Sequence, residues 1–419
     1  MSLPKRKILF LLRTYNDIDH IVPIIWKCVA CDWKVSFLFA DKDFSHDARI
    51  KFIISHGASL VESIPINFYH EKIRPGLSTR LIRPATDRLV AYVFGLYLLH
   101  KKKIEGVVNE WSGGSGRAKA SYFLKAARLV GLPTFCLPHG YFIWKNPLFN
   151  REIADFYRKT KKLPNFNDRN LYSRYVVHSS EQRAEAIRYG IKEEKLIILG
   201  CARFCREWTE VNWGLLSSHV RQETRREFVI LFFLPHWDYN VYRKKCINLI
   251  EKLSQLKETY VEVKAHTRGT GALDRDEMEY LCERGTVGFA NESQHSTALV
   301  RQADLIINFG SSVGFEALQQ GKPVINPRYL HGNQTFFDDS GVVIDTHDDE
   351  STVAVIGEIQ SEGGRSMIEP NVVAQFLNRR VECPDIRGPQ SVLESYLWLL
   401  SGQYFLDNHS QQEQIESSQ

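Results

Sequence analysis

The chain has 419 residues and a formal net charge of +5 at pH 7, and 43% of its residues are hydrophobic and 25% are charged. This length predicts two or three domains, and the composition excludes a disordered or fibrous protein. The mild positive charge argues against a dedicated nucleic-acid-binding protein and suits an enzyme that handles anionic substrates.

Over the first 200 residues, short apolar runs alternate with amphipathic stretches of helical spacing. The first run ends at Arg13 without a small-residue cleavage site, which indicates a strand rather than a signal peptide. Buried strands that alternate with helices form parallel βα units. We therefore expect a Rossmann-like domain over residues 1–215. Its predicted strands are residues 7–12, 35–40, 59–63, 105–109, 134–138, 174–178 and 195–199.

The strand rhythm stops in a polar stretch at residues 206–226 and then resumes. A second Rossmann-like domain is expected over residues 226–385, followed by a closing helix at 386–405 and a polar tail at 406–419. The longest apolar run, residues 89–99, is about half as long as a bilayer crossing, so no transmembrane segment is expected. The predicted strands of the second domain are residues 228–233, 260–266, 287–291, 304–310, 323–327 and 341–346.

The eight cysteines are scattered through apolar surroundings, and the pair Cys28 and Cys31 has no second pair or histidine nearby in the sequence. This pattern predicts buried free thiols in a reducing cytoplasm, with no bound metal. Two Asp-x-Asp sequences, Asp17–Asp19 and Asp274–Asp276, precede predicted helices and are interpreted as caps rather than metal ligands.

Polar and titratable residues gather where the predicted strands end. In parallel sheets, ligands bind outside the carboxyl ends of the strands, so two such domains facing each other would line one cleft with both sets of loops. Structural alternatives remain open for each residue: a hydrogen-bonded histidine, a solvated basic strand end, or an aspartate that caps a helix. The candidates are Glu110, His139, His178 and Arg203 in the first domain, and His236, Trp237, Asp238, Lys264, His266, Arg268, Gly310, Ser311, Ser312 and Glu316 in the second.

The segment "NFGSSVGFEALQQGKPV" at residues 308–324 predicts a phosphate site. Residues 310–312 are expected to open a helix after a buried strand, so that free backbone N–H groups and two hydroxyls face the ligand. Glu316 follows one turn later, within reach of a ribose hydroxyl pair. Lys264, His266 and Arg268 alternate along a strand end, so they would meet an anionic donor from one side. The alternative is an ordinary capped helix with a solvated glutamate.

The order of these motifs resembles the retaining β-Kdo transferase domains of bacterial O-antigen and capsule assembly. Thr267 stands where the sialyl branch of the CMP-sugar transferases has a proline after the histidine, which is a departure from that branch. The resemblance implies a GT-B fold of two Rossmann-like domains that face each other across a cleft. The acceptor side comes first and the donor side second, and a C-terminal helix crosses back. The matching residues are Lys264 and His266, the Gly-Ser-Ser at 310–312 with Glu316, "GKPV" at 321–324 and "PHWD" at 235–238.

The resemblance further implies transfer of Kdo from CMP-Kdo to a saccharide acceptor, with retention of configuration. Retention by double displacement needs a carboxylate that forms a covalent glycosyl adduct, and Asp238 is the candidate. Glu110 is the candidate general base toward the acceptor, and His266 is counted among both the catalytic and the CMP-binding residues. Arg203 is a candidate partner of the Kdo carboxylate, and the sequence does not rank it above Arg268 or Arg117. The remaining predicted substrate contacts are His139, His178, His236 and Trp237.

A monophosphate leaving group held at a helix N-terminus needs little countercharge, so neither a metal nor another cofactor is expected. The expected acceptor is a lipid-linked saccharide or an oligosaccharide, and the basic segment at residues 72–88 suggests peripheral contact with the inner face of the membrane.

The polar tail also suits a linker to further transferase domains. The alternatives are a sialyl or polyol-phosphate transferase on the same fold, a nucleotide-sugar epimerase, and a non-catalytic partner domain.

Overall fold

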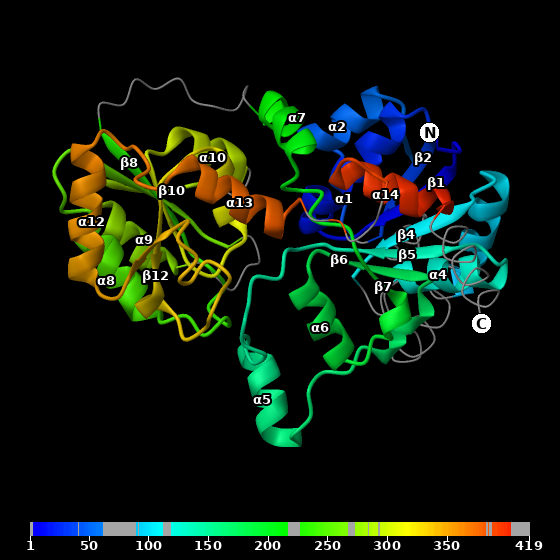
Figure 1. Cartoon of the computed structure of the whole chain (residues 1–419), viewed down its shortest axis with the longest axis horizontal. Coiled ribbons are helices and arrows are strands. Elements are labelled where there is room, and N and C mark those ends of the chain that lie inside the picture. Colours follow the sequence, from blue (N-terminus) through cyan, green and yellow to red (C-terminus); the bar gives the residue numbers. More distant parts are fainter. Residues whose placement is uncertain are drawn as a thin grey trace, which may run out of the picture. The chain divides into compact units, whose positions relative to one another are not determined.

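The chain forms two compact units, each built on a parallel sheet. Unit 1 contains Met1–Tyr141, Asn165–Thr209 and Arg380–Gln419, and unit 2 contains Phe142–Pro164 and Glu210–Arg379 (Figure 1). The chain passes into unit 2 at Glu210, which lies within the polar stretch at residues 206–226 where the sequence pattern places the junction. The structure, a computed structural model, describes residues 3–40, 42–61, 89–90, 92–111, 119–216, 227–266, 273–283, 285–291, 294–382, 384 and 388–403.

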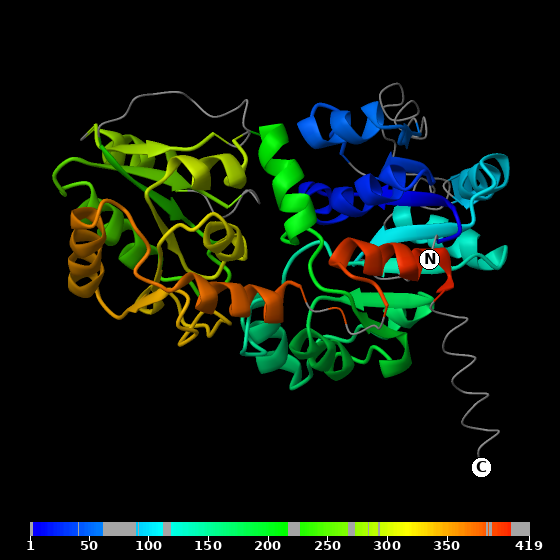
Figure 2. The same ribbon diagram turned by 45° about the horizontal axis from the view of Figure 1, so that its top comes forward.

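Unit 1 has a seven-stranded sheet in the order β3-β2-β1-β4-β5-β6-β7. The C-terminal helix α14 (Val392–Ser401) packs beside α1 (Tyr15–Ala30), so the predicted closing helix is part of unit 1 (Figures 1 and 2). The strands are β1 (Lys7–Leu12), β2 (Lys34–Phe39), β3 (Ser59–Leu60), β4 (Gly106–Glu110), β5 (Thr134–Leu137), β6 (Arg174–Val177) and β7 (Leu196–Ile198). The other helices are α2 (Ala48–Ser55), α4 (Lys119–Leu129), α6 (Ser180–Arg188) and the start of α7 (Arg206–Leu216).

Unit 2 has a six-stranded sheet in the order β10-β9-β8-β11-β12-β13. Its strands are β8 (Phe228–Phe233), β9 (Thr259–Lys264), β10 (Val287–Phe289), β11 (Leu305–Asn308), β12 (Val324–Pro327) and β13 (Ile344–Thr346). Its helices are α5 (Arg151–Thr160), α8 (Arg243–Leu253), α9 (Arg275–Cys282), α10 (Ser296–Gln302), α11 (Val313–Gln319), α12 (Asp349–Ser361) and α13 (Pro370–Arg380).

The central strands of both sheets are buried, which explains their continuous apolar sequences. Five of the six residues of β1 and the last four of β8 are buried. Helices cover a parallel sheet on both faces, so its strands show no alternation of apolar and polar residues. The prediction of two doubly wound parallel sheets is confirmed.

Each sheet has one topological switch point, where strands that follow one another in the chain pass from one side of the first strand to the other. In unit 1, β1 pairs with β2 on one side and β4 on the other. In unit 2, β8 pairs with β9 on one side and β11 on the other. Ligands of doubly wound sheets bind outside the carboxyl ends of the strands at such a switch point. The loops after β1, β4, β8 and β11 are therefore the expected positions of ligand-binding residues.

Both Asp-x-Asp sequences contribute helix caps, as predicted. The Asp17 carboxylate accepts the backbone N–H of Thr14 at 2.8 Å where α1 begins. Asp274 is the N-cap of α9 and accepts the N–H of Glu277 at 2.9 Å. Side-chain acceptors at these positions satisfy N–H groups that the first helical turn leaves without partners.

The described cysteines are free thiols. Cys31 and Cys282 are exposed, so the prediction of buried thiols is wrong for these two, and it holds for the other described cysteines. Within the described ranges, none of the helices combines the length and the apolarity needed to cross a membrane. The basic segment at residues 72–88 lies outside the described residues, and so do Arg268 and the polar tail.

Candidate functional site

Unit 2 brings several of the predicted residues together at its switch point. His236 follows β8, His266 follows β9 and Gly310 follows β11, and these three strands are neighbours in the sheet. The rings of His236 and His266 meet edge to face, with centroids 5.6 Å apart. The loops that the sequence singled out therefore do converge at the carboxyl edge of one sheet.

Asp238 presents its carboxylate at this edge. Its side chain is 41% exposed, and its Oδ2 lies 3.3 Å from Nδ1 of His236. The backbone N–H of Asp238 also lies 3.2 Å from the same nitrogen. Both contacts use the same ring nitrogen: it accepts from the backbone N–H when it carries no hydrogen, and it donates to the carboxylate when it carries one.

The structural alternative for Asp238, a cap on the following helix, is wrong. Helix α8 begins at Arg243 with Tyr242 as its N-cap, and no side chain accepts a hydrogen bond there. The backbone carbonyl of Asp238 instead accepts the N–H of Arg151 at 2.8 Å. The carboxylate of Asp238 thus has no role in starting α8.

Trp237 packs against the hydrophobic core of unit 2, and the guanidinium of Arg243 lies 5.8 Å from the centre of its ring. A second tryptophan, which the sequence reasoning missed, is Trp144, which lies beside Gly310. Trp144 stacks on Phe149 at 5.7 Å and contacts Tyr239 at 5.3 Å. Residues 142–164 belong to unit 2 although they are numbered among the strands of unit 1, so no sequence pattern places Trp144 there.

The predicted phosphate-binding turn has a constrained backbone. Gly310 has φ +78°, and a Cβ built there would lie 2.8 Å from Cη2 of Trp144. Ser312 is the N-cap of α11 and makes no side-chain cap hydrogen bond, while the hydroxyl of Ser311 accepts the N–H of Val313 at 3.3 Å. The ordinary capping alternative therefore applies to Ser311 and not to Ser312.

We expect Gly310→Ala to lower the free energy of unfolding of unit 2 by about 1–3 kcal/mol, because it adds a left-handed backbone penalty to a clash with Trp144. Gly357→Ala in α12 is the matched control, since its Cβ would meet nothing within 4 Å and no positive φ is involved. That control should raise stability by about 0.5–1 kcal/mol. Urea unfolding of both variants checks the prediction, and a stable Gly310→Ala protein would contradict it.

Two predicted donor-binding side chains are engaged inside unit 2. Glu316 is buried, and its carboxylate accepts the hydroxyls of Ser296 at 3.0 Å and of Thr297, which ties α11 to α10. Lys264 is also buried, and its ammonium donates to the carbonyl of Asn291 at 2.6 Å. These contacts favour structural roles for both residues.

Unit 1 has a second polar cluster at its own switch point. Glu110 ends β4 with a side chain that is 0% exposed, and its Oε1 lies 2.8 Å from Nη2 of Arg13, which follows β1. Its Oε2 is hydrogen-bonded to Nδ1 of His139, which follows β5. The His139 side chain is 23% exposed. A substrate can therefore reach His139 but not Glu110, which holds the ring from behind.

Asp17 completes this cluster from the first turn of α1. It is fully buried, and its Oδ2 accepts backbone N–H groups from Arg13 at 2.6 Å and Thr14 at 2.8 Å. Burial, together with the nearby charge of Glu110, raises the pKa of Asp17. Asp17, Glu110 and His139 bring ligand atoms within 4.8 Å of one another. Arg13 pairs with Glu110, and two backbone N–H groups bind Asp17, so both carboxylates already have partners within unit 1.

The two other predicted residues of unit 1 are held elsewhere. His178 is buried and stacks on Tyr141 with ring centroids 4.8 Å apart, and burial lowers its pKa to about 3. Arg203 is 13% exposed and donates to Asp19 at 2.7 Å. Asp19 is also paired with Arg49. Neither side chain is placed as an open ligand contact within unit 1.

No family model matches the sequence, and no curated protein matches it. Solved structures do match over nearly the whole chain. One is a UDP-GlcNAc 2-epimerase from Neisseria meningitidis bound to UDP-GlcNAc, with 14% identity, a TM-score of 0.53 and coverage of 89% of this chain and 99% of that one. A putative UDP-N-acetylglucosamine 2-epimerase from Listeria monocytogenes has 10% identity, a TM-score of 0.55 and coverage of 96% and 97%.

A glycosyltransferase from Rickettsia africae has 13% identity, a TM-score of 0.53 and coverage of 95% of this chain and 98% of its own. The chain has the GT-B fold. At these sequence identities, the structural similarity establishes the fold alone, and the reaction has to be inferred from the residues of the site. The GT-B part of the expected resemblance is thereby confirmed, while Kdo and CMP stay predictions.

Proposed function

We propose that the protein is a GT-B glycosyltransferase that transfers Kdo from CMP-Kdo to a saccharide acceptor with retention of configuration. The observation that carries this proposal is the position of Asp238. Its carboxylate is exposed, lies beside His236 and stands at the switch point of the unit 2 sheet. A retaining transfer by double displacement needs such a carboxylate next to the donor.

In the first step, a carboxylate oxygen of Asp238 attacks the anomeric carbon of Kdo. The bond between that carbon and the phosphate oxygen breaks, and CMP leaves with the electron pair. His236 and His266 are the imidazoles at the same edge that can donate hydrogen bonds to the departing phosphate. The backbone turn at Gly310 offers N–H groups to the same charge.

In the second step, a hydroxyl of the acceptor attacks the adduct and releases the carboxylate of Asp238. The proton of that hydroxyl must go to a general base. Glu110 is fully buried and its carboxylate already holds Arg13 and His139. We therefore assign the base role to the partly exposed His139 and a positioning role to Glu110, which fixes the ring through Nδ1 and leaves Nε2 for the proton.

The test is to incubate the protein with CMP-Kdo and no acceptor, and to record the intact mass and the release of CMP. The wild type should gain the mass of one Kdo residue, and Asp238→Asn should not. Asp276→Asn is the matched control, because Asp276 is an exposed aspartate on α9 of the same unit. It should form the adduct at the wild-type rate.

An adduct that persists in Asp238→Asn would remove Asp238 as the nucleophile. Acceptor-independent conversion of UDP-GlcNAc, followed by NMR, would overturn the transferase proposal in favour of a nucleotide-sugar epimerase. A wild type that forms its adduct with CMP-sialic acid and not with CMP-Kdo would overturn the sugar assignment and keep the mechanism. The proposed acceptor is a lipid-linked saccharide or an oligosaccharide.

A further inference from the structure

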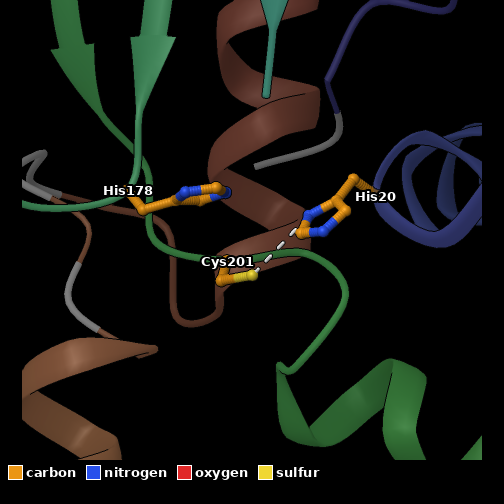
Figure 3. A group of neighbouring side chains, drawn as sticks. All are labelled: His20, His178 and Cys201. Atoms are coloured by element: carbon orange, nitrogen blue, oxygen red, sulfur yellow. Dashed lines mark hydrogen bonds between the residues drawn. The ribbon is translucent and has the colours of Figure 1, made fainter. Parts of the chain in front are cut away.

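Two histidines and a cysteine meet in the interior of unit 1, outside the cluster around Glu110. His20 lies on α1, His178 follows β6 and Cys201 follows β7 (Figure 3). They are 3%, 1% and 0% exposed. Figure 3 shows the two imidazoles and the thiol reaching toward one another from these three elements. Nothing in the proposed transfer reaction uses them.

The ligand atoms of this cluster are close to the spacing of a zinc site. Nδ1 of His20 lies 4.0 Å from Sγ of Cys201, and no two of the three ligand atoms are more than 4.8 Å apart. Zinc bonds of about 2.1 Å to nitrogen and about 2.3 Å to sulfur place tetrahedral ligand atoms about 3.4–3.6 Å apart. Side-chain rotations that shorten the longest separation by up to about 1.4 Å bring the ligand atoms to this spacing.

One nitrogen of the His178 ring lacks a hydrogen-bond partner among the described residues. Among the described residues, Nδ1 of His178 has no hydrogen-bond partner although it is fully buried. A buried nitrogen left in this state costs about 1–3 kcal/mol. A cation bound at Nδ1 would remove that cost, because neutral imidazole donates a lone pair to a metal.

The backbone and ring contacts around the cluster hold its members in place. The N–H of Cys201 donates to the carbonyl of Val381 at 3.0 Å. His178 stacks on Tyr141, whose hydroxyl donates to the carbonyl of Arg380 at 2.7 Å. Metal ligands need such support to keep their orientation.

Arg203 and Asp19, two charged groups that act on His20, belong to a network of ion pairs. Arg203 pairs with Asp19, and Arg49 pairs with both Asp19 and Asp47. These two arginines and two aspartates sum to zero charge, so they do not repel an incoming cation as a free arginine would.

We propose that His20, His178 and Cys201 bind one Zn²⁺ ion. Two nitrogen bonds and one sulfur bond form, the thiol proton of Cys201 passes to solvent, and a water molecule completes four-fold coordination. Imidazole and thiolate ligands favour Zn²⁺ over Mg²⁺ and Ca²⁺, which prefer oxygen ligands. The ion joins α1 to the loops after β6 and β7, which are far apart in the sequence, and so stabilises unit 1.

The test uses the full-length chain, incubated with one equivalent of Zn²⁺, passed over a desalting column and analysed by inductively coupled plasma mass spectrometry. The wild type should keep about one zinc per chain. In Cys201→Ser and His178→Asn, the affinity for zinc should fall by more than about 100-fold. Loss of a contact that only supports a ligand costs about 10- to 100-fold in metal affinity, and loss of the ligand itself should cost more. Cys205→Ser is the matched control: Cys205 is a buried thiol of the same unit that donates to the carbonyl of Ala202, and it should keep its zinc.

A second measurement protects the test against variants that fail to fold. Added to the wild type, Co²⁺ should give a thiolate-to-metal charge-transfer band that Zn²⁺ abolishes, and a chelator should lower the melting temperature of wild type and Cys205→Ser alike. A wild type that retains no zinc and shows no such band would overturn the proposal. So would zinc retained equally by Cys201→Ser and the wild type. These readouts do not use CMP-Kdo, so they stand or fall separately from the transferase proposal.

Discussion

His139→Ala should slow the breakdown of the glycosyl adduct by about 10²- to 10⁴-fold, the usual contribution of a general base. Adduct formation needs Asp238 and not His139, so its rate should change little. In a single turnover with CMP-Kdo, where water replaces the acceptor, both proteins should form the adduct, and the adduct of the variant should persist longer than that of the wild type. Intact-mass measurement at successive times follows both rates.

Chemical rescue separates a base from a residue that only supports the fold. The His139 side chain is 23% exposed, so truncation to alanine leaves a space open to solvent. Added imidazole should restore part of the hydrolysis rate of His139→Ala. His100→Ala is the control, since His100 is an exposed histidine of the same unit, and it should hydrolyse the adduct at the wild-type rate. Unchanged hydrolysis in His139→Ala would refute the assignment.

Glu110 is a poorer target for the same question. Its Oε1 pairs with Arg13 at 2.8 Å in a fully buried setting. Neutralising Glu110 leaves the charge of Arg13 buried without its partner, which destabilises the fold by itself. A loss of activity in Glu110→Gln would therefore mix a catalytic effect with a structural one.

The fold was predictable because it depends on short-range sequence patterns. The apolar run at residues 228–233 coincides with β8, and the run at 7–12 coincides with β1. Strand ends were predictable for the same reason, and with them the positions of His139 and His236. A loop that follows a buried strand must lie at the carboxyl edge of the sheet, whichever residues it contains.

The sequence could not show which polar side chains are engaged within the fold. Glu316 follows a phosphate-type turn, but its carboxylate accepts hydroxyls from α10, a neighbour that no local pattern identifies. Lys264 has the spacing of an anion-binding residue and instead donates to Asn291. Such partners depend on packing between elements, which side-chain periodicity does not encode.

Long-range pairings also hid the cluster around Cys201. Cys201 is one of several cysteines scattered through apolar surroundings, which is why the sequence argued for an inert thiol. Strand order brings the loops after β6 and β7 next to each other, and α1 supplies His20 from near the start of the chain. A search of the sequence for ligand spacing fails when each ligand comes from a different element.

Arg49→Ala should lower the free energy of unfolding of unit 1 by about 3–5 kcal/mol, the cost of breaking a buried ion pair by removing one partner. Arg49 is 1% exposed and binds Asp19 and Asp47, the latter at 2.8 Å between Nη2 and Oδ2. Without the guanidinium, Asp19 keeps Arg203, but Asp47 loses its partner in this cluster. Hydrogen exchange of peptides from α1 and α2 should report the loss, while peptides from α8 in unit 2 should not change.

The effect should shrink as the pH falls. Burial raises the pKa of Asp47, but the hydrogen bond and charge of Arg49 outweigh it, so the folded pKa lies below the ordinary value. A lowered folded pKa contributes stability above the unfolded pKa of about 3.9, and that stability disappears as the pH falls through the folded value. The stability difference between wild type and Arg49→Ala should thus be largest near neutral pH and narrow below about pH 4.

An exposed ion pair provides the control for this prediction. Arg275 pairs with Glu279 on the surface of α9, with side chains 85% and 61% exposed. Arg275→Ala should change stability by no more than about 0.5 kcal/mol, because solvent screens an exposed pair. Equal destabilisation by Arg275→Ala and Arg49→Ala would mean that burial does not increase the contribution of the Arg49 ion pairs to the free energy of unfolding. A constant difference across pH would mean that the carboxylate of Asp47 is not the group that Arg49 stabilises.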